Sequence, residues 1–160
     1  MAEPLKSSAQ RVQDCLSQHG CDFTVREFTR STRTAQDAAD ALSCDVGQIA
    51  KSLIFKDKGT GEPVLVVASG SNRVDTKKIK AHLGIKLSRV DADYVREHVG
   101  YAIGGVPPVA HNSKLTTILD IDLQRQPTIW AAAGTPNAMF EVSPEALVTL
   151  TEGSWLDLAE

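Results

Sequence analysis

The segment Val64-Leu65-Val66-Val67-Ala68 has five consecutive apolar residues, and it decides the fold. A strand with one face in water alternates apolar and polar side chains, whereas a strand covered on both faces does not. This segment therefore predicts a central strand over residues 63–69, with other elements packed on both of its faces. The turn Lys58-Gly59-Thr60-Gly61 separates it from a second expected strand over residues 49–56.

Helices are expected around these two strands. Residues 8–19 repeat apolar side chains at helical spacing, and Thr34-Ala35-Gln36-Asp37 resembles a capping box that opens a second helix. The small side chains of that second helix suggest close packing against a sheet. Two more helices are expected at residues 75–82 and 91–98, each begun by an aspartate.

The other apolar segments predict the rest of the sheet. Strands are expected at residues 22–28, 114–123, 128–133 and 139–142, with a short helix or turn at 144–150. Strands and helices are interleaved without the regular spacing of βαβ units. We therefore expect an α+β fold, in which a mixed, mostly antiparallel sheet or partial barrel is surrounded by helices. No linker or repeat divides the chain, so residues 1–160 are expected to form one domain.

The charge is distributed unevenly. The chain of 160 residues has a net charge of −3, which alone argues against a nucleic-acid partner. Residues 51–86, however, hold eight Lys and Arg residues against three acidic ones, as a local phosphate-binding face would. Lys77, Lys78 and Lys80 of an expected helix are the candidates for contacts with RNA. A solvated lysine-rich helix without a partner would explain the same pattern.

Several classes of protein are disfavoured. Cys15, Cys21 and Cys44 are odd in number and form no CxxC pair, which argues against a disulfide framework and a zinc site. The chain contains no HExxH sequence and no phosphate-binding loop, so neither a metal nor a cofactor is expected. No apolar run approaches the roughly 20 residues that span a bilayer. The N-terminus lacks an apolar secretory signal, so we expect a cytoplasmic protein with no membrane partner.

Lys51 and the loop after the central strand are the first candidates for a binding site. Lys51 interrupts an apolar strand, so its ammonium either reaches the rim of the core or approaches a phosphate or ester oxygen at a pocket wall. Ser69, Asn72 and Arg73 follow the central strand and precede a helix. That position suits an anionic or hydroxyl-rich ligand, although a capped turn would use the same residues.

A loop rich in glycine and proline is the second candidate. The segment Gly100-Tyr101-Ala102-Ile103-Gly104-Gly105-Val106-Pro107-Pro108-Val109-Ala110-His111 combines three glycines and two prolines before a histidine. Glycine lets the main chain approach a ligand closely, and proline fixes the chain direction. His111 either orients a substrate or caps main-chain groups. A further loop of small residues, with Gly134 and Thr135, forms either the floor of a compact pocket or a tight turn.

Asp120 and Asp122 alternate with Ile121 and Leu123, so both carboxylates are expected to face solvent from a strand. No acidic residue is visibly spaced to complete a triad with His111.

Together these motifs resemble the YbaK/EbsC family, also called prolyl-tRNA synthetase-associated or INS-like editing domains. The resemblance spans nearly the whole chain, from the helix at Thr34 to the turn at Pro144. In this family the glycine-proline loop usually continues with Phe-Gly or a similar pair, where this chain has Val109-Ala110-His111. The resemblance is carried by Ile49-Ala50-Lys51-Ser52-Leu53, Val66-Val67-Ala68-Ser69-Gly70, Arg73-Val74-Asp75, Lys78, residues 100–108 and Ala133-Gly134.

The resemblance implies a function. Members of the family hydrolyse the ester of mischarged aminoacyl-tRNA in trans. It implies that Lys51 contacts the 3′ end of the tRNA. It also implies that the main chain of residues 104–108, with Gly104, Gly105 and Pro108, positions the ester carbonyl and either a water or a ribose hydroxyl. An aminoacyl ester is already activated, so positioning and charge stabilisation can replace a strong nucleophile.

The implied substrate is a mischarged aminoacyl-tRNA that carries a small amino acid, with alanine, cysteine, serine and threonine all open. An aminoacyl-tRNA synthetase is a further partner that the resemblance allows. Two other functions stay open from the residues alone. One is a non-catalytic tRNA-binding or synthetase-associated module, and the other is an esterase or amidase for small molecules.

Overall fold

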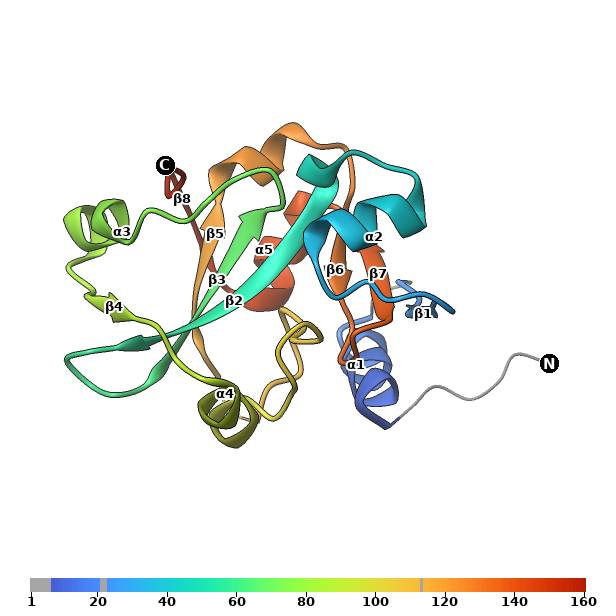
Figure 1. Ribbon diagram of the computed structural model, residues 1–160, viewed down its shortest axis with the longest axis horizontal. Helices are drawn as coiled ribbons and strands as arrows, with labels where there is room; N and C mark the ends of the chain where they lie inside the picture. Colours follow the sequence, from blue (N-terminus) through green and yellow to red (C-terminus); the bar gives the residue numbers. More distant parts are fainter. Residues whose placement is uncertain (1–6, 21–22, 113) are drawn as a thin grey trace.

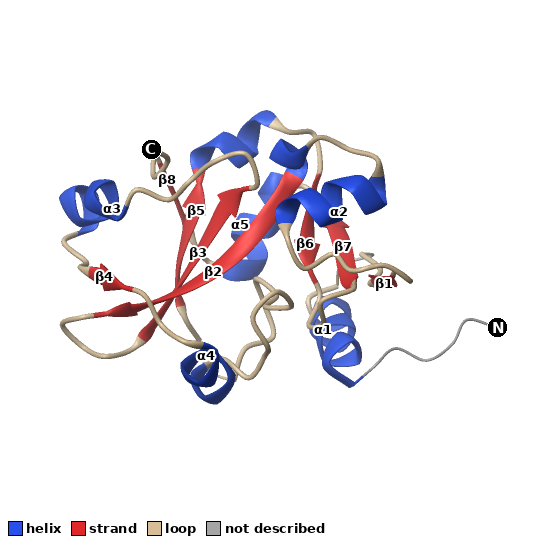
Figure 2. Cartoon of the chain, viewed as in Figure 1, coloured by secondary structure: helices blue, strands red, loops and turns tan. Residues whose placement is uncertain are grey.

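Within residues 7–20, 23–112 and 114–160, which the computed structural model describes, eight strands form one mixed sheet (Figures 1 and 2). Its order is β1-β7-β6-β2-β3-β5-β8, and β4 also pairs with β2. Four of the strand pairs are antiparallel and three are parallel, as the expected mixed, mostly antiparallel sheet requires. The strands are β1 (Arg26–Glu27), β2 (Ile49–Asp57), β3 (Pro63–Ser69), β4 (Leu87–Ser88), β5 (Thr116–Asp120), β6 (Ile129–Ala132), β7 (Ala138–Val142) and β8 (Ser154–Leu156).

Strand β3 is central and covered on both faces, as its apolar sequence predicts. Leu65 and Val67 belong to the larger core cluster, which includes side chains of α1, α4 and α5. Val64, Val66 and Ala68 belong to a second cluster on the other face, together with Ile79 of α3. Alternate residues of one strand therefore hold two separate cores together.

The helices begin where the sequence places their caps. Thr34 accepts a hydrogen bond from the Asp37 N–H at the start of α2, and Asp75 and Asp91 cap α3 and α4 in the same way. Among the described residues, no helix has the length and apolar character that crossing a membrane requires. The helices are α1 (Ser7–Gln18), α2 (Ala35–Leu42), α3 (Thr76–Leu83), α4 (Ala92–His98) and α5 (Pro144–Thr151), with 3₁₀ turns η1 (Val46–Gln48) and η2 (Ile121–Arg125).

Helix α2 packs closely on the sheet, as its small side chains predict. Ala38 and Ala39 are buried against Ile49 of β2 and Met139 of β7. Figure 1 shows α2 in front of β6 and β7. This packing places the N-terminus of α2 next to the point where β2 leaves β6.

The strand expected at residues 114–123 ends early, and the last part of that segment forms a 3₁₀ turn. Strand β5 stops at Asp120, and the chain continues as η2. The Asp120 side chain accepts a hydrogen bond from the Asp122 N–H as the cap of that turn, and it is fully buried. The expectation that Asp120 faces solvent is therefore wrong, because β5 lies between β3 and β8 and residues 117–120 are all buried, so neither face of the strand is in water there.

Other boundaries also differ from expectation. Of the strand expected at residues 22–28, only β1 (Arg26–Glu27) forms, while Cys21 and Asp22 lie outside the described residues. Residues 144–150 are helical, within α5. The short strands β4 and β8 were not expected, because two or three residues carry no readable alternation.

Candidate functional site

One edge of β2 is open along its middle. On one side β2 pairs with β3 along its length, from Ala50 to Lys56. On the other side it pairs with β6 only at Ile49 and Ala50, and with β4 only at Lys56 and Asp57. Among the described strands, none pairs with residues 51–55 on this side.

The main chain of Ser52 points into this gap. Hydrogen-bonding groups alternate between the two edges along a strand that lies between two neighbours. The Ile49 carbonyl accepts a hydrogen bond from the Gly70 N–H, at 2.7 Å, on the β3 side. Odd-numbered residues of β2 therefore face β3, and the N–H and C=O groups of Ser52 and Ile54 face the open edge.

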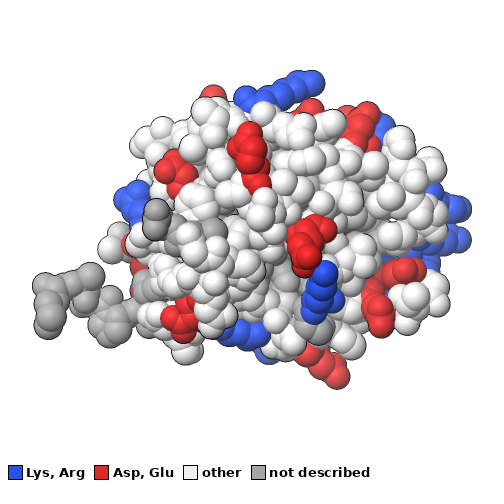
Figure 3. Space-filling view, turned by 180° about the vertical axis from the view of Figure 1, so that it is seen from behind, with Lys and Arg blue, Asp and Glu red and all other residues white. Residues whose placement is uncertain are grey.

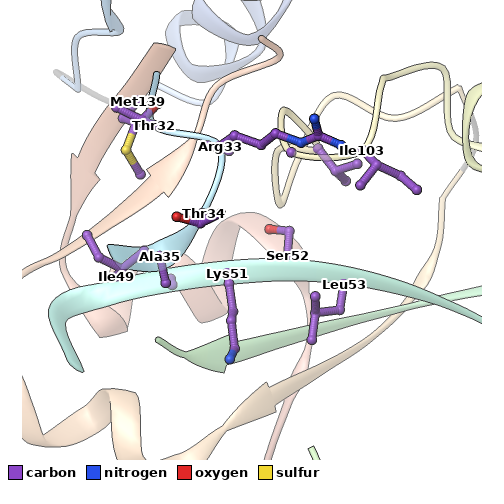
Figure 4. Close-up of a pocket in the computed structure, with 14 residues that line it drawn as sticks. Thr32, Arg33, Thr34, Ala35, Ile49, Lys51, Ser52, Leu53, Ile103 and Met139 are labelled. Atoms are coloured by element: carbon purple, nitrogen blue, oxygen red, sulfur yellow. The ribbon is translucent and has the colours of Figure 1, made fainter. Parts of the chain in front are cut away.

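A small, mostly apolar cavity of about 310 Å³ lies at this gap (Figure 4). It draws residues from four places: the chain that leads into α2, the open edge of β2, the glycine-proline loop, and strands β6 and β7. The set contains two cationic side chains and no acidic one. Its lining residues are Thr32, Arg33, Thr34, Ala35, Ile49, Ala50, Lys51, Ser52, Leu53, Ile103, Gly104, Val106, Ala132 and Met139.

Lys51 and Ser52 point to opposite faces of β2. Figure 4 shows Ser52 on the same side as Arg33 and Ile103, and Lys51 directed away from them. The Lys51 ammonium therefore does not face the glycine-proline loop. It donates a hydrogen bond of 2.6 Å to the main-chain carbonyl of Asn72.

A buried carboxylate holds the loop that receives Lys51. Asp120 Oδ2 accepts hydrogen bonds from the Ser69 N–H, at 3.0 Å, and from Asn72 Nδ2, at 2.8 Å. Asn72 Nδ2 also donates to Asp122, at 2.8 Å. The Ser69 hydroxyl donates to the Gly47 carbonyl. Two of the predicted substrate-binding residues, Ser69 and Asn72, are thus engaged in hydrogen bonds within the protein, where they help to hold the loop that Lys51 contacts.

The surroundings of Lys51 lower its pKa. Burial lowers the pKa of Lys51 below its ordinary value of 10.5. The negative charge of Asp120 raises this pKa, and the positive charge of Arg73 lowers it, so the balance is a lowered pKa.

The Lys51 side of β2 faces a second, larger cavity of about 800 Å³. Four cationic side chains line it, and two acidic ones. Its floor includes apolar side chains of β2 and β4, and Arg89 enters from the segment after β4. We call this set the basic cavity: Lys51, Leu53, Phe55, Arg73, Val74, Asp75, Thr76, Lys77, Leu87, Arg89 and Glu160.

The structure separates the three lysines that were predicted to bind RNA. Lys77 lines the basic cavity. Lys78 forms an ion pair with Asp157, at 3.3 Å, and Lys80 is exposed outside the cavity lining. Figure 3, seen from behind, shows Lys and Arg gathered at the edge where α3 lies, while acidic residues are scattered over the rest of that face.

Only part of the glycine-proline loop reaches the small cavity. Gly104 lines it with φ +92°, and a Cβ there would overlap the Arg33 side chain. Gly105 lies behind Gly104, where a Cβ would come within 2.8 Å of the Thr135 main chain. The Gly134 N–H donates to the Gly105 carbonyl, at 2.9 Å. Gly105, Gly134 and Thr135 therefore form the support of the loop.

His111 also supports the loop and does not line the small cavity. Its Nε2 lies 2.7 Å from the Pro107 carbonyl oxygen, and its ring meets the Tyr101 ring edge-on. Burial lowers the pKa of His111 below its ordinary value of 6.5, the hydrogen bond to Pro107 raises it, and Arg11 lowers it. Pro108, which is buried, shares a surface hollow with His111.

Sequence reasoning missed several lining residues. Arg33 lies in a polar segment before a helix cap, and Ser52 lies in an apolar strand beside the more conspicuous Lys51. Met139 looks like any core residue. No local pattern marks these three side chains, because they meet only when α2, β2 and β7 pack together.

Known proteins are similar to this chain in sequence and fold. A family model described as an aminoacyl-tRNA editing domain matches residues 29–150. The chain is 31% identical over 156 residues to YwhH of Bacillus subtilis (strain 168), a protein of uncharacterized function, which covers 96% of this chain and 98% of YwhH. It is 29% identical over 156 residues to EbsC of Enterococcus faecalis (strain ATCC 700802 / V583), which covers 96% of this chain and 93% of EbsC. EbsC is provisionally named a Cys-tRNA(Pro)/Cys-tRNA(Cys) deacylase.

A solved structure is similar over the same length. The crystal structure of a protein provisionally named a trans-editing enzyme for prolyl-tRNA synthetase aligns with a TM-score of 0.91. The two sequences are 45% identical, and the alignment covers 98% of this chain and 99% of that one.

Proposed function

Because this chain belongs to the YbaK/EbsC family of aminoacyl-tRNA editing domains, we propose that it hydrolyses, in trans, the ester bond of mischarged tRNA that carries a small amino acid. Editing of aminoacyl-tRNA is the function of the family. The small amino acid and the residue roles given below are the proposal.

One observation carries this proposal: two cavities of different chemistry share Lys51 and Leu53 at the open edge of β2. The small cavity is mostly apolar and suits an amino-acid side chain. The basic cavity suits the phosphates of the tRNA 3′ end, because four cations line it. An aminoacyl ester joins these two kinds of group, so its ester bond would cross the open edge beside Lys51.

The chemistry needs few protein groups. The oxygen of a water molecule bonds to the ester carbonyl carbon, the bond from that carbon to the ribose oxygen breaks, and the ribose oxygen takes a proton. The products are the free amino acid and uncharged tRNA. Lys51 would bind the 3′ end and stabilise negative charge on the oxygens near it. The small cavity is lined by no His, Cys, Asp or Glu, as suits an ester that is already activated.

The main chain would supply the other contact with the ester. The Gly105 N–H already donates to the Ala102 carbonyl, at 3.0 Å, so it is engaged within the loop. The Ser52 N–H, which faces the open edge, is the better placed donor for the carbonyl oxygen. Gly104 would shape the opposite wall, because its lack of a side chain leaves room for Arg33.

The names of two relatives suggest which tRNA to test first. EbsC is provisionally named for Cys-tRNA(Pro) and Cys-tRNA(Cys), and the solved relative for prolyl-tRNA synthetase. We therefore take mischarged tRNA(Pro) as the first substrate, with prolyl-tRNA synthetase as the synthetase partner to test.

The test is deacylation of tRNA(Pro) charged with alanine, cysteine, serine or threonine. Lys51→Ala should lower kcat/KM by about 100- to 1000-fold, the usual loss when one preorganised donor is removed. Lys80→Ala, an exposed lysine outside both cavities, is the matched control and should stay close to wild type. Full activity of Lys51→Ala would contradict the proposed role of Lys51 in deacylation. Tight tRNA binding by the wild type without hydrolysis of any ester would favour the non-catalytic binding module instead.

A further inference from the structure

Ser52 carries a buried hydroxyl that has no hydrogen-bond partner among the described residues. An unpaired buried hydroxyl destabilises a fold, and natural structures contain few of them. Among the described residues, Ser88 on β4 has the only other such side-chain atom. Ser52 is a lining residue of the small cavity and Ser88 lines neither cavity, so only Ser52 adjoins the proposed substrate site.

Each of the other two hydroxyls of the small cavity makes a hydrogen bond within the protein. Thr32 Oγ1 donates to the Pro136 carbonyl, at 3.1 Å, and Thr34 Oγ1 accepts from the Asp37 N–H, at 3.0 Å. Figure 4 shows the Ser52 side chain on the side of Arg33 and Ile103, within the lining. Of the three hydroxyl side chains in the lining, Ser52 is thus the one that makes no hydrogen bond with the described residues.

The charges of the lining decide which part of the substrate meets Ser52. The cavity holds Arg33 and Lys51 and no carboxylate, so it offers the α-ammonium group of an aminoacyl ester no counter-charge. The uncharged amino-acid side chain is therefore the part that enters. Ile49, Val106 and Met139 surround its carbon atoms, and the Ser52 hydroxyl remains for a polar atom.

We propose that Ser52 Oγ binds the β-hydroxyl of the substrate side chain, so that this protein favours esters of β-hydroxy amino acids, serine above all, over the alanine ester. This inference rests on the proposed function and names its substrate class. The expected preference is modest. With an alanyl ester, the Ser52 hydroxyl stays without a partner, as it is in the unliganded protein. The seryl ester gains one net hydrogen bond, which corresponds to a preference of about tenfold in kcat/KM.

The first test compares tRNA(Pro) charged with serine and with alanine. Ser52→Ala should lower kcat/KM for the seryl ester by about tenfold and leave the alanyl ester within about twofold of wild type. Ser88→Ala, the matched control, should change neither. An equal loss on both esters would overturn the inference, since Ser52 would then serve positioning alone, and so would no loss on either.

A stability measurement separates a binding role from a structural one. The Ser52 hydroxyl has no partner within the described part of the fold, so Ser52→Ala should melt at the same temperature as wild type or higher. A clear fall in melting temperature would show that the hydroxyl supports the fold.

A binding experiment keeps the inference testable if hydrolysis is absent. Non-hydrolysable adenosine analogues that carry serine or alanine through an amide are titrated calorimetrically into wild type and Ser52→Ala. Wild type should bind the seryl analogue about tenfold more tightly, and Ser52→Ala should lose that difference. Equal binding of both analogues to wild type would overturn the inference whatever the activity, whereas seryl preference without hydrolysis would overturn only the proposed enzyme.

Discussion

The Lys51 ammonium lies 2.6 Å from the main-chain carbonyl oxygen of Asn72, and this contact joins the middle of β2 to the loop after β3. Asn72 is held in turn by the buried carboxylate of Asp120, at 2.8 Å. A flexible four-carbon side chain thereby gains a fixed position. The position of Lys51, which the sequence marks as a candidate site residue, therefore depends on Asp120, which was expected to face solvent.

The first prediction concerns this support. Asp120→Asn replaces one carboxylate oxygen by an amide that cannot accept, so at least one of the donors on Ser69, Asn72 and Asp122 loses its partner. We expect the free energy of unfolding to fall by about 1–3 kcal/mol, measured by urea denaturation. Asp157→Asn, which breaks only an exposed ion pair with Lys78, should change it by less than about 1 kcal/mol. Equal effects of the two variants would contradict the role of Asp120.

The second prediction concerns the wall that Gly104 forms. Gly104→Ala imposes a left-handed residue, at a cost of roughly 1–2 kcal/mol, and pushes the Arg33 side chain away from the cavity. Gly84→Ala is the matched control, because φ there is +71° but an added Cβ meets no atom within 4 Å. Both variants should lose similar stability in thermal melts, and only Gly104→Ala should also lose deacylation. Normal deacylation by Gly104→Ala would show that Arg33 and the loop leave the substrate untouched.

The third prediction concerns pH. The pKa of His111 is lowered in the folded chain, chiefly by burial, so the unfolded chain takes up this proton at a higher pH than the folded chain does. The contribution of His111 to stability is therefore complete above pH 6.5, and it is lost as the pH falls through 6.5 toward the folded pKa. His111→Gln, which stays neutral, should flatten the dependence of the urea midpoint on pH between about 7.5 and 5. An unchanged slope would mean that His111 titrates alike in both states.

The fourth prediction concerns the basic cavity. Arg73→Ala and Arg89→Ala should each weaken tRNA binding and reduce the slope of log K against log salt by about 1, as expected for the loss of one phosphate contact. Lys80→Ala carries the same change of charge outside the cavity and should leave the slope closer to wild type. Filter binding over a range of salt concentrations gives all the slopes. Identical slopes for the three variants would indicate a diffuse attraction to the whole basic surface.

Local sequence patterns determined much of this protein. The unbroken apolar run of β3 required cover on both faces, and Leu65 and Val66 indeed lie in different cores. Helices α2, α3 and α4 begin at Thr34, Asp75 and Asp91, because each of these side chains accepts a hydrogen bond from a main-chain N–H of the first turn. These features depend on neighbours within a few residues, which is why the sequence shows them directly.

Contacts between distant segments decided the site. Strand β2 pairs with β6 at one end and with β4 at the other, which leaves the edge open between them. The sequence of β2 does not show where either pairing ends. In the folded chain Arg89 and Lys51 line one cavity, Arg33 lies beside Gly104, and cover on both faces of β5 buries Asp120. Sequence alone could name Lys51 and Gly104. Only the tertiary structure could show that the Lys51 side chain points away from the side of β2 where Gly104 and Arg33 lie, because strand order and register are set by packing across the whole sheet.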